Sequence, residues 1–264
     1  MAEASNEPRA SQTPGAPLVL IPVTAEDEAR RKRRIGISIG TGVVMVLAAA
    51  GLIYKRSVDP IHAQESFDSG VRLFKIARYD QAILSFDRAT ALKRDLVDGY
   101  LMRGRAYVAM AKTENAVQDF TRVIEMRPSD RHAFVERGFA YMEMKDHQSA
   151  LADANRALTV DAKFAPAYNL RGQVVRAMGD PAKAVEDFTR AVALDPNQDN
   201  YYQRGATYQM LGQHRSAIAD FDQVIAFDPG SPAGYFARAE SRRAVGDLAG
   251  AKADHLLGRT IDGQ

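Results

Sequence analysis

Side chains that commonly do chemistry are present in this chain of 264 residues, but their spacing matches no catalytic or metal site. The histidines form neither an HExxH motif nor a pair at ligand spacing, and the chain has no phosphate-binding loop and no GxSxG motif. The five histidines are His62, His132, His147, His214 and His255. We therefore predict a protein without catalytic residues, bound metal or cofactor.

One set of charged residues does recur at a fixed distance. Five arginines are each followed sixteen residues later by an aspartate, and an earlier segment with Ser69 and Ser85 at these two places lacks both charges. Because the charges occur together, we predict five partly buried ion pairs with two-pronged hydrogen bonds. The alternative is a basic groove for phosphate or carboxylate ligands, against which the matched aspartates argue. The pairs are Arg103 with Asp119, Arg137 with Asp153, Arg171 with Asp187, Arg204 with Asp220 and Arg238 with Asp254.

The overall composition is that of a folded protein whose charges nearly cancel. There are 35 basic and 33 acidic residues, for a net charge of +2, so the chain lacks the positive field that binds nucleic-acid phosphates. We predict no nucleic-acid partner. The absence of cysteine excludes disulfides, thiolate metal ligands, cysteine nucleophiles and a cysteine-linked lipid anchor.

The charged pairs belong to a longer pattern that recurs about every 34 residues after His62. A small residue follows each of the five arginines, and an alanine stands twelve residues after each small residue. The small residues are Gly70, Gly104, Gly138, Gly172, Gly205 and Ala239, and the alanines are Ala82, Ala116, Ala150, Ala184, Ala217 and Ala251. Such a period predicts one structural unit repeated six times.

The pattern resembles the tetratricopeptide repeat (TPR). The resemblance implies an all-α fold, a right-handed TPR α-solenoid in which each repeat is a pair of antiparallel helices and neighbouring repeats share one core. The domain spans residues 63–264, with repeats near 63–96, 97–130, 131–164, 165–197, 198–231 and 232–264. Positions are counted below from the first residue of each repeat.

Helical geometry accounts for the small residues. Positions 4, 8 and 11 share one stripe of a helix, and glycine at position 8 with alanine at position 20 lets two helices approach closely. The fourth repeat is one residue short, so we expect a local change of superhelical pitch after Pro196. In the last repeat, Arg242, His255 and Gly258 replace packed residues, which is typical of a terminal cap.

The same resemblance implies a partner-binding groove, lined by positions 2, 5, 9 and 12 of the first helix in each repeat. Its first half is apolar and its second half polar, so we expect a peptide to dock its apolar anchors over the first three repeats. The alternative, that Val71 and Val135 only complete the core, stays open. Position 5 lacks the lysine with which a two-carboxylate clamp begins, so chaperone tails are not predicted ligands. The groove residues are Phe67, Val71, Phe74, Leu101, Arg105, Val135, Phe139, Met142, Asn169, Gln173, Arg176, Tyr202, Gln209 and Phe236.

Residues 35–54 read IGISIGTGVVMVLAAAGLIY and carry no charge. At about 1.5 Å per residue, a helix of this length spans a hydrocarbon core of about 30 Å, so we predict one transmembrane helix in a lipid bilayer. The alternative is a cleaved signal peptide, since Ala48, Ala49 and Ala50 offer small residues to a peptidase.

The flanks of this segment suggest its orientation. Residues 30–34 are all basic and only Lys55 and Arg56 follow the segment, which favours a cytoplasmic N-terminus and repeats on the outer side, periplasmic or lumenal, with the bacterial inner membrane as the expected location. Gly36 and Gly40 have the GxxxG spacing of a helix-pairing face, which would allow a homodimer, although glycine is also common in membrane helices. We expect a disordered tail at 1–34, containing the basic cluster, and a linker at 55–62.

These features predict a membrane-anchored adaptor that binds a partner protein or peptide and is not an enzyme, for example in membrane-complex or envelope assembly. Two alternatives remain at this point. One is an organelle-type protein-targeting receptor with cytosolic repeats, and the other is a regulatory subunit of a membrane enzyme.

Overall fold

The structure of the protein is a computed structural model that describes residues 25–263. These residues form twelve helices and no strand. Contacts divide the chain into two parts, before and after the bond between Ser57 and Val58. The helices are α1 (Ala25–Lys75), α2 (Tyr79–Leu92), α3 (Val97–Ala109), α4 (Thr113–Met126), α5 (Arg131–Glu143), α6 (His147–Val160), α7 (Ala165–Ala177), α8 (Pro181–Leu194), α9 (Gln198–Met210), α10 (His214–Phe227), α11 (Pro232–Ala244) and α12 (Leu248–Ile261).

Helix α1 is 51 residues long and includes segments that were not predicted to be helical. Residues 25–34, expected in a disordered tail, and residues 55–62, expected as a linker, are helical. The physical reason at 25–34 is composition, because alanine, glutamate, lysine and arginine are strong helix formers. The rest of the expected tail, residues 1–24, lies outside the described residues.

The apolar segment 35–54 lies within α1, but few of its side chains are described. Those of residues 44–49 are described and are exposed, whereas Gly36 and Gly40 lie outside the residues whose side chains the structure describes. Within the described residues, no helix combines the length and the apolar character needed to cross a bilayer.

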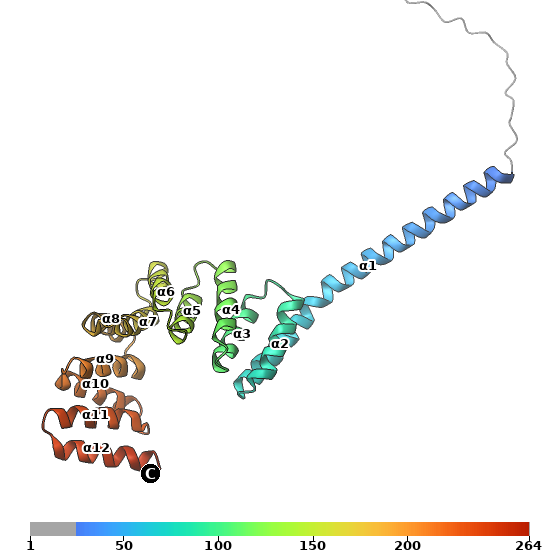
Figure 1. Ribbon diagram of the computed structural model, residues 1–264. Coiled ribbons are helices and arrows are strands. Elements are labelled where there is room, and N and C mark those ends of the chain that lie inside the picture. Colours follow the sequence, from blue (N-terminus) through green and yellow to red (C-terminus); the bar gives the residue numbers. More distant parts are fainter. Residues whose placement is uncertain (1–24, 264) are drawn as a thin grey trace, which may run out of the picture. The chain divides into compact units, whose positions relative to one another are not determined.

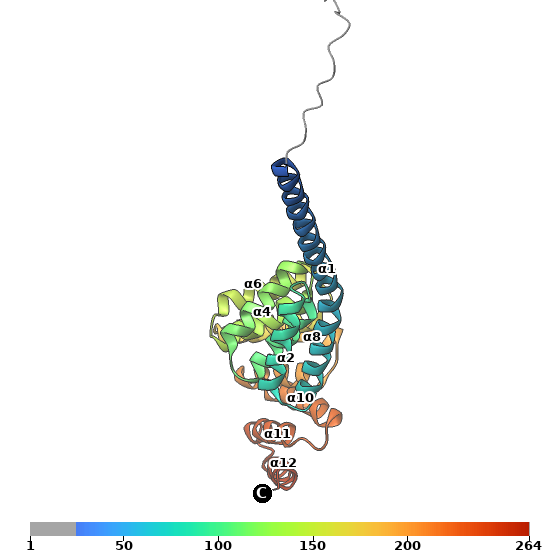
Figure 2. The same cartoon turned by 90° about the vertical axis from the view of Figure 1, so that its right-hand side faces the viewer.

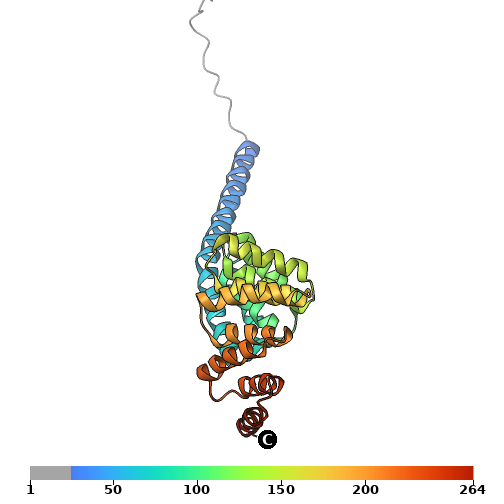
Figure 3. The same cartoon turned by 90° about the vertical axis from the view of Figure 1, so that its left-hand side faces the viewer.

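From residue 97 onward, the helices follow the repeats expected from the sequence. The first helices α3, α5, α7, α9 and α11 begin at residues 97, 131, 165, 198 and 232, which are the residues where the sequence pattern restarts. The second helix of each repeat begins at position 17; these are the even-numbered helices, from α2 to α12. Figure 1 shows the helix pairs from α2 to α12 following one another in a stack, and Figures 2 and 3 show the same succession from two other sides.

The turn inside each repeat uses a residue with positive φ at position 15. In the first three repeats this residue is an alanine or a lysine, such as Lys145 at 60°, and in the last three it is a glycine, such as Gly179 at 94°. Glycine enters this left-handed region without a Cβ clash, so the last three turns are the less strained ones. The next residue is an aspartate in three repeats, for example Asp146, and its side chain accepts a backbone hydrogen bond that fixes the start of the second helix.

The core of a repeat is a contact between small residues and one aromatic ring. The alanine at position 20 is buried in every repeat, and the phenylalanine at position 24 is fully buried in the four repeats that have it. A Cβ atom added to Gly172 would lie 2.8 Å from Cε1 of Phe188, so only glycine fits under the ring. In the third repeat, where Ala154 replaces the phenylalanine, Leu170 of the next repeat covers Gly138 instead.

Candidate functional site

Five arginines and five aspartates form a ladder along the stack, with one pair in each repeat from the second to the sixth. In every pair, Nε and Nη2 of the arginine donate to the two carboxylate oxygens of the aspartate sixteen residues later, at 2.6–2.9 Å. The aspartates are buried, as Asp153 at 4% exposure shows. The pairing therefore has the two-pronged geometry that the sequence spacing suggested.

Most ladder arginines also reach back to the preceding repeat. Nη1 of Arg103 donates to Asp87 at 2.6 Å, and Nη1 of Arg171 donates to Asn155 at 3.1 Å. Each of these acceptors stands at position 25 of the repeat before. The arginine thus ties the two helices of its own repeat together and also ties that repeat to its neighbour.

Arg204 is the exception in this ladder. The fourth repeat is one residue short, so position 25 of that repeat, Thr189, lies fifteen rather than sixteen residues before Arg204. Among the described side chains, Arg204 donates hydrogen bonds only to Asp220, at 2.9 and 2.7 Å. The short turn after Pro196 therefore removes one hydrogen bond between repeats, while the change of pitch stays a prediction.

The electrostatics of the ladder favour a structural role. Hydrogen bonds with Asp119 hold the pKa of the Arg103 guanidinium above its ordinary value, although burial acts against this. Four of the five guanidinium groups also lie over the tyrosine ring at position 4 of the same repeat, for example Arg171 at 5.3 Å from the Tyr168 centroid. Each of the five is already bound to a carboxylate, so the ladder offers no free cation to an outside anion.

The predicted groove lies on the first helices of the repeats. These helices touch each other in the pairs α5–α7, α7–α9 and α9–α11. We call the surface formed by positions 5, 9 and 12 of the first helices the inner face. Its side chains have different environments in the two halves of the stack.

In the first three repeats, the inner face is apolar and partly open. Phe139 on α5 is 36% exposed, and Leu101 and Met142 are half-buried against neighbouring core residues. Val135 is only 6% exposed and belongs to a core cluster, which favours the alternative that it completes the packing between helices. The half-buried residues of the first repeat on this face are Phe67, Val71 and Phe74.

Arg105 is the one charged residue predicted for this apolar half. Its Nε donates to Oε1 of Glu136 on α5 at 2.8 Å. Both side chains are about one-third exposed, at 38% and 31%. The pair therefore links the first helices of two repeats near the surface and leaves the apolar side chains beside it open.

In the later repeats, the polar side chains predicted to bind a partner bond to the chain itself. Nδ2 of Asn169, which is 4% exposed, donates to Asp199 at 2.8 Å and to Asn200 at 2.7 Å, while its oxygen accepts from Gln173 at 2.6 Å. Asn169 is buried, so its assignment to an open groove is wrong. The sequence pattern could not reveal this, because the partners lie on the next repeat.

Two further groove residues make the same kind of link. Arg176 on α7 donates to the backbone and side-chain oxygens of Gln203 and, at 3.0 Å, to Thr207, and burial lowers its pKa. Gln209 on α9 donates to the backbone oxygen of Ala237 at 2.8 Å and to Ser241 at 2.9 Å. The polar half of the inner face therefore joins first helices to each other.

Two aromatic groove residues lie near the C-terminal end of the stack. Tyr202 is half-buried, with its ring 5.9 Å from that of Phe221, and it lines a hollow of about 290 Å³ between the fifth and sixth repeats. Phe236 is half-buried over Gly258, with its ring 5.5 Å from that of His255. Gly258 and His255, which were predicted to belong to a terminal cap, thus make room for the ring of Phe236.

This face also contains apolar and polar residues that were not predicted from the sequence. Val108, at position 12 of the second repeat, is 42% exposed and extends the apolar area. Thr207 and Ser241, at position 10 of the last two repeats, are fully buried hydrogen-bond partners of the inner face. A signal for these two residues was present in the sequence. Position 10 is apolar in the second, third and fourth repeats, which have Ala106, Ala140 and Val174, but polar in the fifth and sixth.

The described histidines form no metal site. Among the side chains that the structure describes, no three histidine, aspartate or glutamate residues are placed to hold a metal ion. His147 and His214 begin second helices, and Nδ1 of each is buried without a hydrogen-bond partner. They stand in different repeats and share no pocket.

Comparison with known protein families identifies the repeats. Residues 101–169, 165–198 and 199–231 each match a model of the tetratricopeptide repeat. No curated protein sequence matches the chain.

Solved structures show the same fold at low sequence identity. PilW, a widely conserved type IV pilus biogenesis factor, is 16% identical with a TM-score of 0.68, over 75% of this chain and 92% of PilW. A thermophilic TPR protein of Thermus thermophilus is 20% identical with a TM-score of 0.59, over 69% of this chain and 98% of that one. YrrB, a TPR protein with an unusual peptide-binding site, is 18% identical with a TM-score of 0.52, over 68% and 93%.

Proposed function

This chain contains tetratricopeptide repeats, and from that premise we propose that it is an adaptor without catalytic activity, which binds a segment of a partner protein on its inner face. The observation that carries the proposal is the contrast between the two halves of that face. Val108 and Phe139 expose 42% and 36% of their surface in the first half. The polar side chains of the second half are occupied by hydrogen bonds within the chain.

The apolar half suits a segment with two or three apolar anchors. Apolar side chains gain most when a concave surface removes them from water, and such anchors dominate peptide recognition. The pair between Arg105 and Glu136 beside them supplies polar atoms at the edge, where a peptide backbone could bond. The hollow beside Tyr202 is a second contact point for a longer segment.

The fold supports a binding role but does not identify the partner. One fold serves many ligands, so the partner has to come from chemistry at the inner face and from experiment. We expect the partner segment to be apolar rather than acidic, because the ladder arginines are all bound to aspartates.

The decisive experiment compares two exposed apolar residues. The full chain carrying Phe139→Glu, and as a matched control Met178→Glu, is crosslinked in its native membranes or cell extract, and the captured proteins are identified. Met178 is 45% exposed at the end of α7, away from positions 5, 9 and 12. We expect at least one protein to be captured by the parent and the control but lost with Phe139→Glu. Full capture by a folded Phe139→Glu protein removes the proposal.

The proposal includes anchoring to a membrane through residues 35–54. It is supported by the twenty uncharged residues of that segment and by the basic residues 30–34 before it. The N-terminus would then be cytoplasmic and the repeats periplasmic or lumenal, as in an adaptor for envelope assembly. A homodimer through Gly36 and Gly40 belongs to the same proposal.

A phosphatase fused after Gly263 tests this orientation. Activity only outside the cytoplasm supports the adaptor with outer repeats, whereas activity only inside supports the alternative of a targeting receptor with cytosolic repeats. A protein that washes off membranes at high pH without detergent contradicts the anchor itself. Co-purification of a defined enzyme activity would favour the regulatory-subunit alternative.

A further inference from the structure

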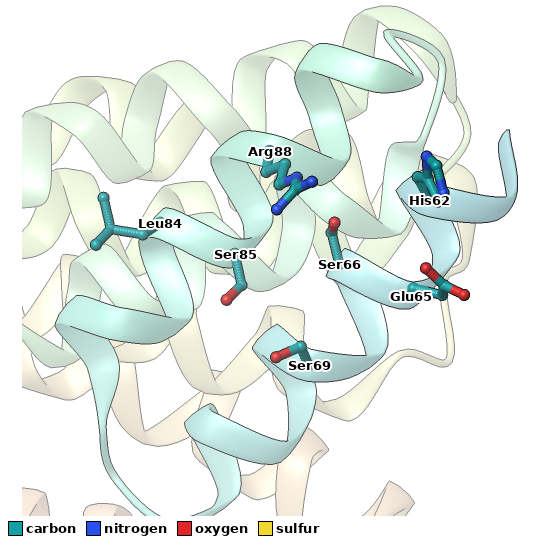
Figure 4. Close-up of a pocket in the computed structure, with 7 residues that line it drawn as sticks. All are labelled: His62, Glu65, Ser66, Ser69, Leu84, Ser85 and Arg88. Atoms are coloured by element: carbon teal, nitrogen blue, oxygen red, sulfur yellow. The ribbon is translucent and has the colours of Figure 1, made fainter. Parts of the chain in front are cut away.

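The first repeat of the stack lacks three large side chains that the other repeats have. Its positions 4, 7 and 23 hold Ser66, Ser69 and Ser85, where the others hold an aromatic residue, the ladder arginine and the ladder aspartate. These short side chains leave a hollow of about 380 Å³ between α1 and α2, drawn in Figure 4. The hollow is also lined by His62 and Glu65 of α1 and by Leu84 and Arg88 of α2, all four of which are exposed.

The contacts between consecutive repeats, which we call inner junctions, show which positions meet when one repeat stacks on the next. Position 25 lies against position 7 of the next repeat, since Arg238 donates to Asp222 at 2.6 Å. Position 28 lies against position 3, since a Cβ atom added to Gly234 would lie 2.9 Å from Cγ1 of Ile225. The junction between α2 and α3 has both contacts at the same positions.

The last helix departs from the other repeats at these two positions. Position 25 is polar in the first five repeats but is Leu256 in the sixth, where it is 66% exposed. Position 28 is threonine or apolar in the first five repeats but is Arg259 in the sixth, where it is exposed. If another repeat with an arginine at position 7 followed, that arginine would lie against Leu256. Leucine has no oxygen to accept a hydrogen bond from it.

The changes at the two ends are complementary. With the spacing of an inner junction, Leu256 would face Ser69 and its hollow, and Arg259 would face Glu65. Leu256 thus meets the short side chain of Ser69 instead of the arginine that inner repeats have at position 7, and Arg259, a cation, meets Glu65, an anion. Two C-terminal ends, or two first repeats, would not bring an apolar side chain to a hollow and a cation to an anion in this way.

We propose that the C-terminal end of one copy of this chain binds the first repeat of a second copy, so that α12 of one stacks on α1 and α2 of the other. Leu256 of the first copy enters the serine-lined hollow of the second, and Arg259 pairs with Glu65. Because the contact joins two different surfaces, it leaves both outer ends free and extends into a head-to-tail chain rather than a closed pair.

Crosslinking tests the contact directly, because the chain has no cysteine of its own. Full-length Ser69→Cys and Leu256→Cys proteins are treated with a short bis-maleimide, separately and mixed. We expect a crosslinked dimer in the mixture only. Asn155→Cys is the matched control, since Asn155 stands at the same position 25 but faces Arg171 of the next repeat within its own chain, and it should give no product with Ser69→Cys.

Charge reversal supplies a second readout that does not need cysteine. Glu65→Arg and Arg259→Glu change exposed residues, so we expect the fold to be kept. Each alone should weaken self-association about fivefold to tenfold in sedimentation experiments. A mixture of the two variants should regain association, because the reversed end of one matches the reversed end of the other.

Three results would overturn the proposal. They are no crosslink in the mixture of Ser69→Cys and Leu256→Cys, an equal crosslink with the Asn155→Cys control, and self-association that neither charge reversal changes. The last result would indicate pairing through another part of the chain, such as Gly36 and Gly40.

Discussion

Arg171 and Asp187 face each other across the two helices of the fourth repeat and are joined by two hydrogen bonds, of 2.9 Å from Nε and 2.6 Å from Nη2. The carboxylate side is the more buried, with 8% of the Asp187 side chain exposed against 29% of Arg171. Loss of the arginine would therefore leave a buried negative charge without a partner.

We predict that Arg171→Met lowers the free energy of unfolding by roughly 3 kcal/mol, because removing one partner of a buried pair isolates the other charge. Arg171→Met combined with Asp187→Leu should recover most of this loss, since both charges are then gone. Urea unfolding followed by circular dichroism measures both. Equal stability of the two variants and the parent would show that the pair has no structural role.

The close contact between Gly172 and the ring of Phe188 leads to a second prediction. Gly172→Ala should destabilise the protein, because overpacking costs about 1–3 kcal/mol and exceeds the gain of about 1 kcal/mol that alanine brings to a helix. Adding Phe188→Leu should relieve the clash in part. The sixth repeat already combines Ala239 with a histidine in place of the phenylalanine. A more stable Gly172→Ala protein in thermal unfolding would contradict the predicted clash.

Asn169 provides a third prediction, which separates structure from binding on the inner face. Asn169→Ala removes the hydrogen bonds that Nδ2 donates to Asp199 and to the buried Asn200, so the free energy of unfolding should fall by about 1–3 kcal/mol. At a temperature where the variant is folded, capture of the partner should equal that of the parent, in contrast to Phe139→Glu. An unchanged unfolding curve with lost capture would place Asn169 in the binding site instead.

Asp146 at the start of α6 gives a prediction about pH. Hydrogen bonding from the hydroxyl and backbone N–H of Ser149 lowers the pKa of Asp146 below its ordinary value of 3.8. A carboxyl whose pKa is lower in the folded state stabilises the fold above its unfolded pKa, and this stabilisation is lost as the pH falls through the folded pKa. Asp146→Ala should therefore lower the melting temperature at pH 7, and the difference should shrink below pH 3.8.

Asp146→Asn is the control for this prediction. Asparagine caps a helix nearly as well as aspartate but does not titrate. Relative to Asp146→Asn, the parent should therefore lose its advantage on acidification, as measured by circular dichroism between pH 7 and pH 3. A difference between parent and Asp146→Ala that stays constant over this range would exclude a contribution from the charge.

Much of the fold follows from local sequence. The recurring glycine and alanine place two helices in close contact, and the helices α3, α5, α7, α9 and α11 begin where the pattern restarts. The ladder could also be read from the chain, because Ser69 and Ser85 lose both charges together in the first repeat. Periodicity carries this information because each repeat has the same internal geometry.

The tertiary structure decided what the side chains on the inner face do. The sequence could place Asn169 and Phe139 at groove positions, but only the stacking of α7 on α9 shows that the first is buried and hydrogen-bonded, and only the structure shows that the second stays open. The same holds for Arg204, which lacks the hydrogen bond to the preceding repeat that the other four ladder arginines make. Positions within a repeat are set by helical geometry that the sequence records, whereas contacts between repeats join residues about 30 apart and depend on how the helices pack.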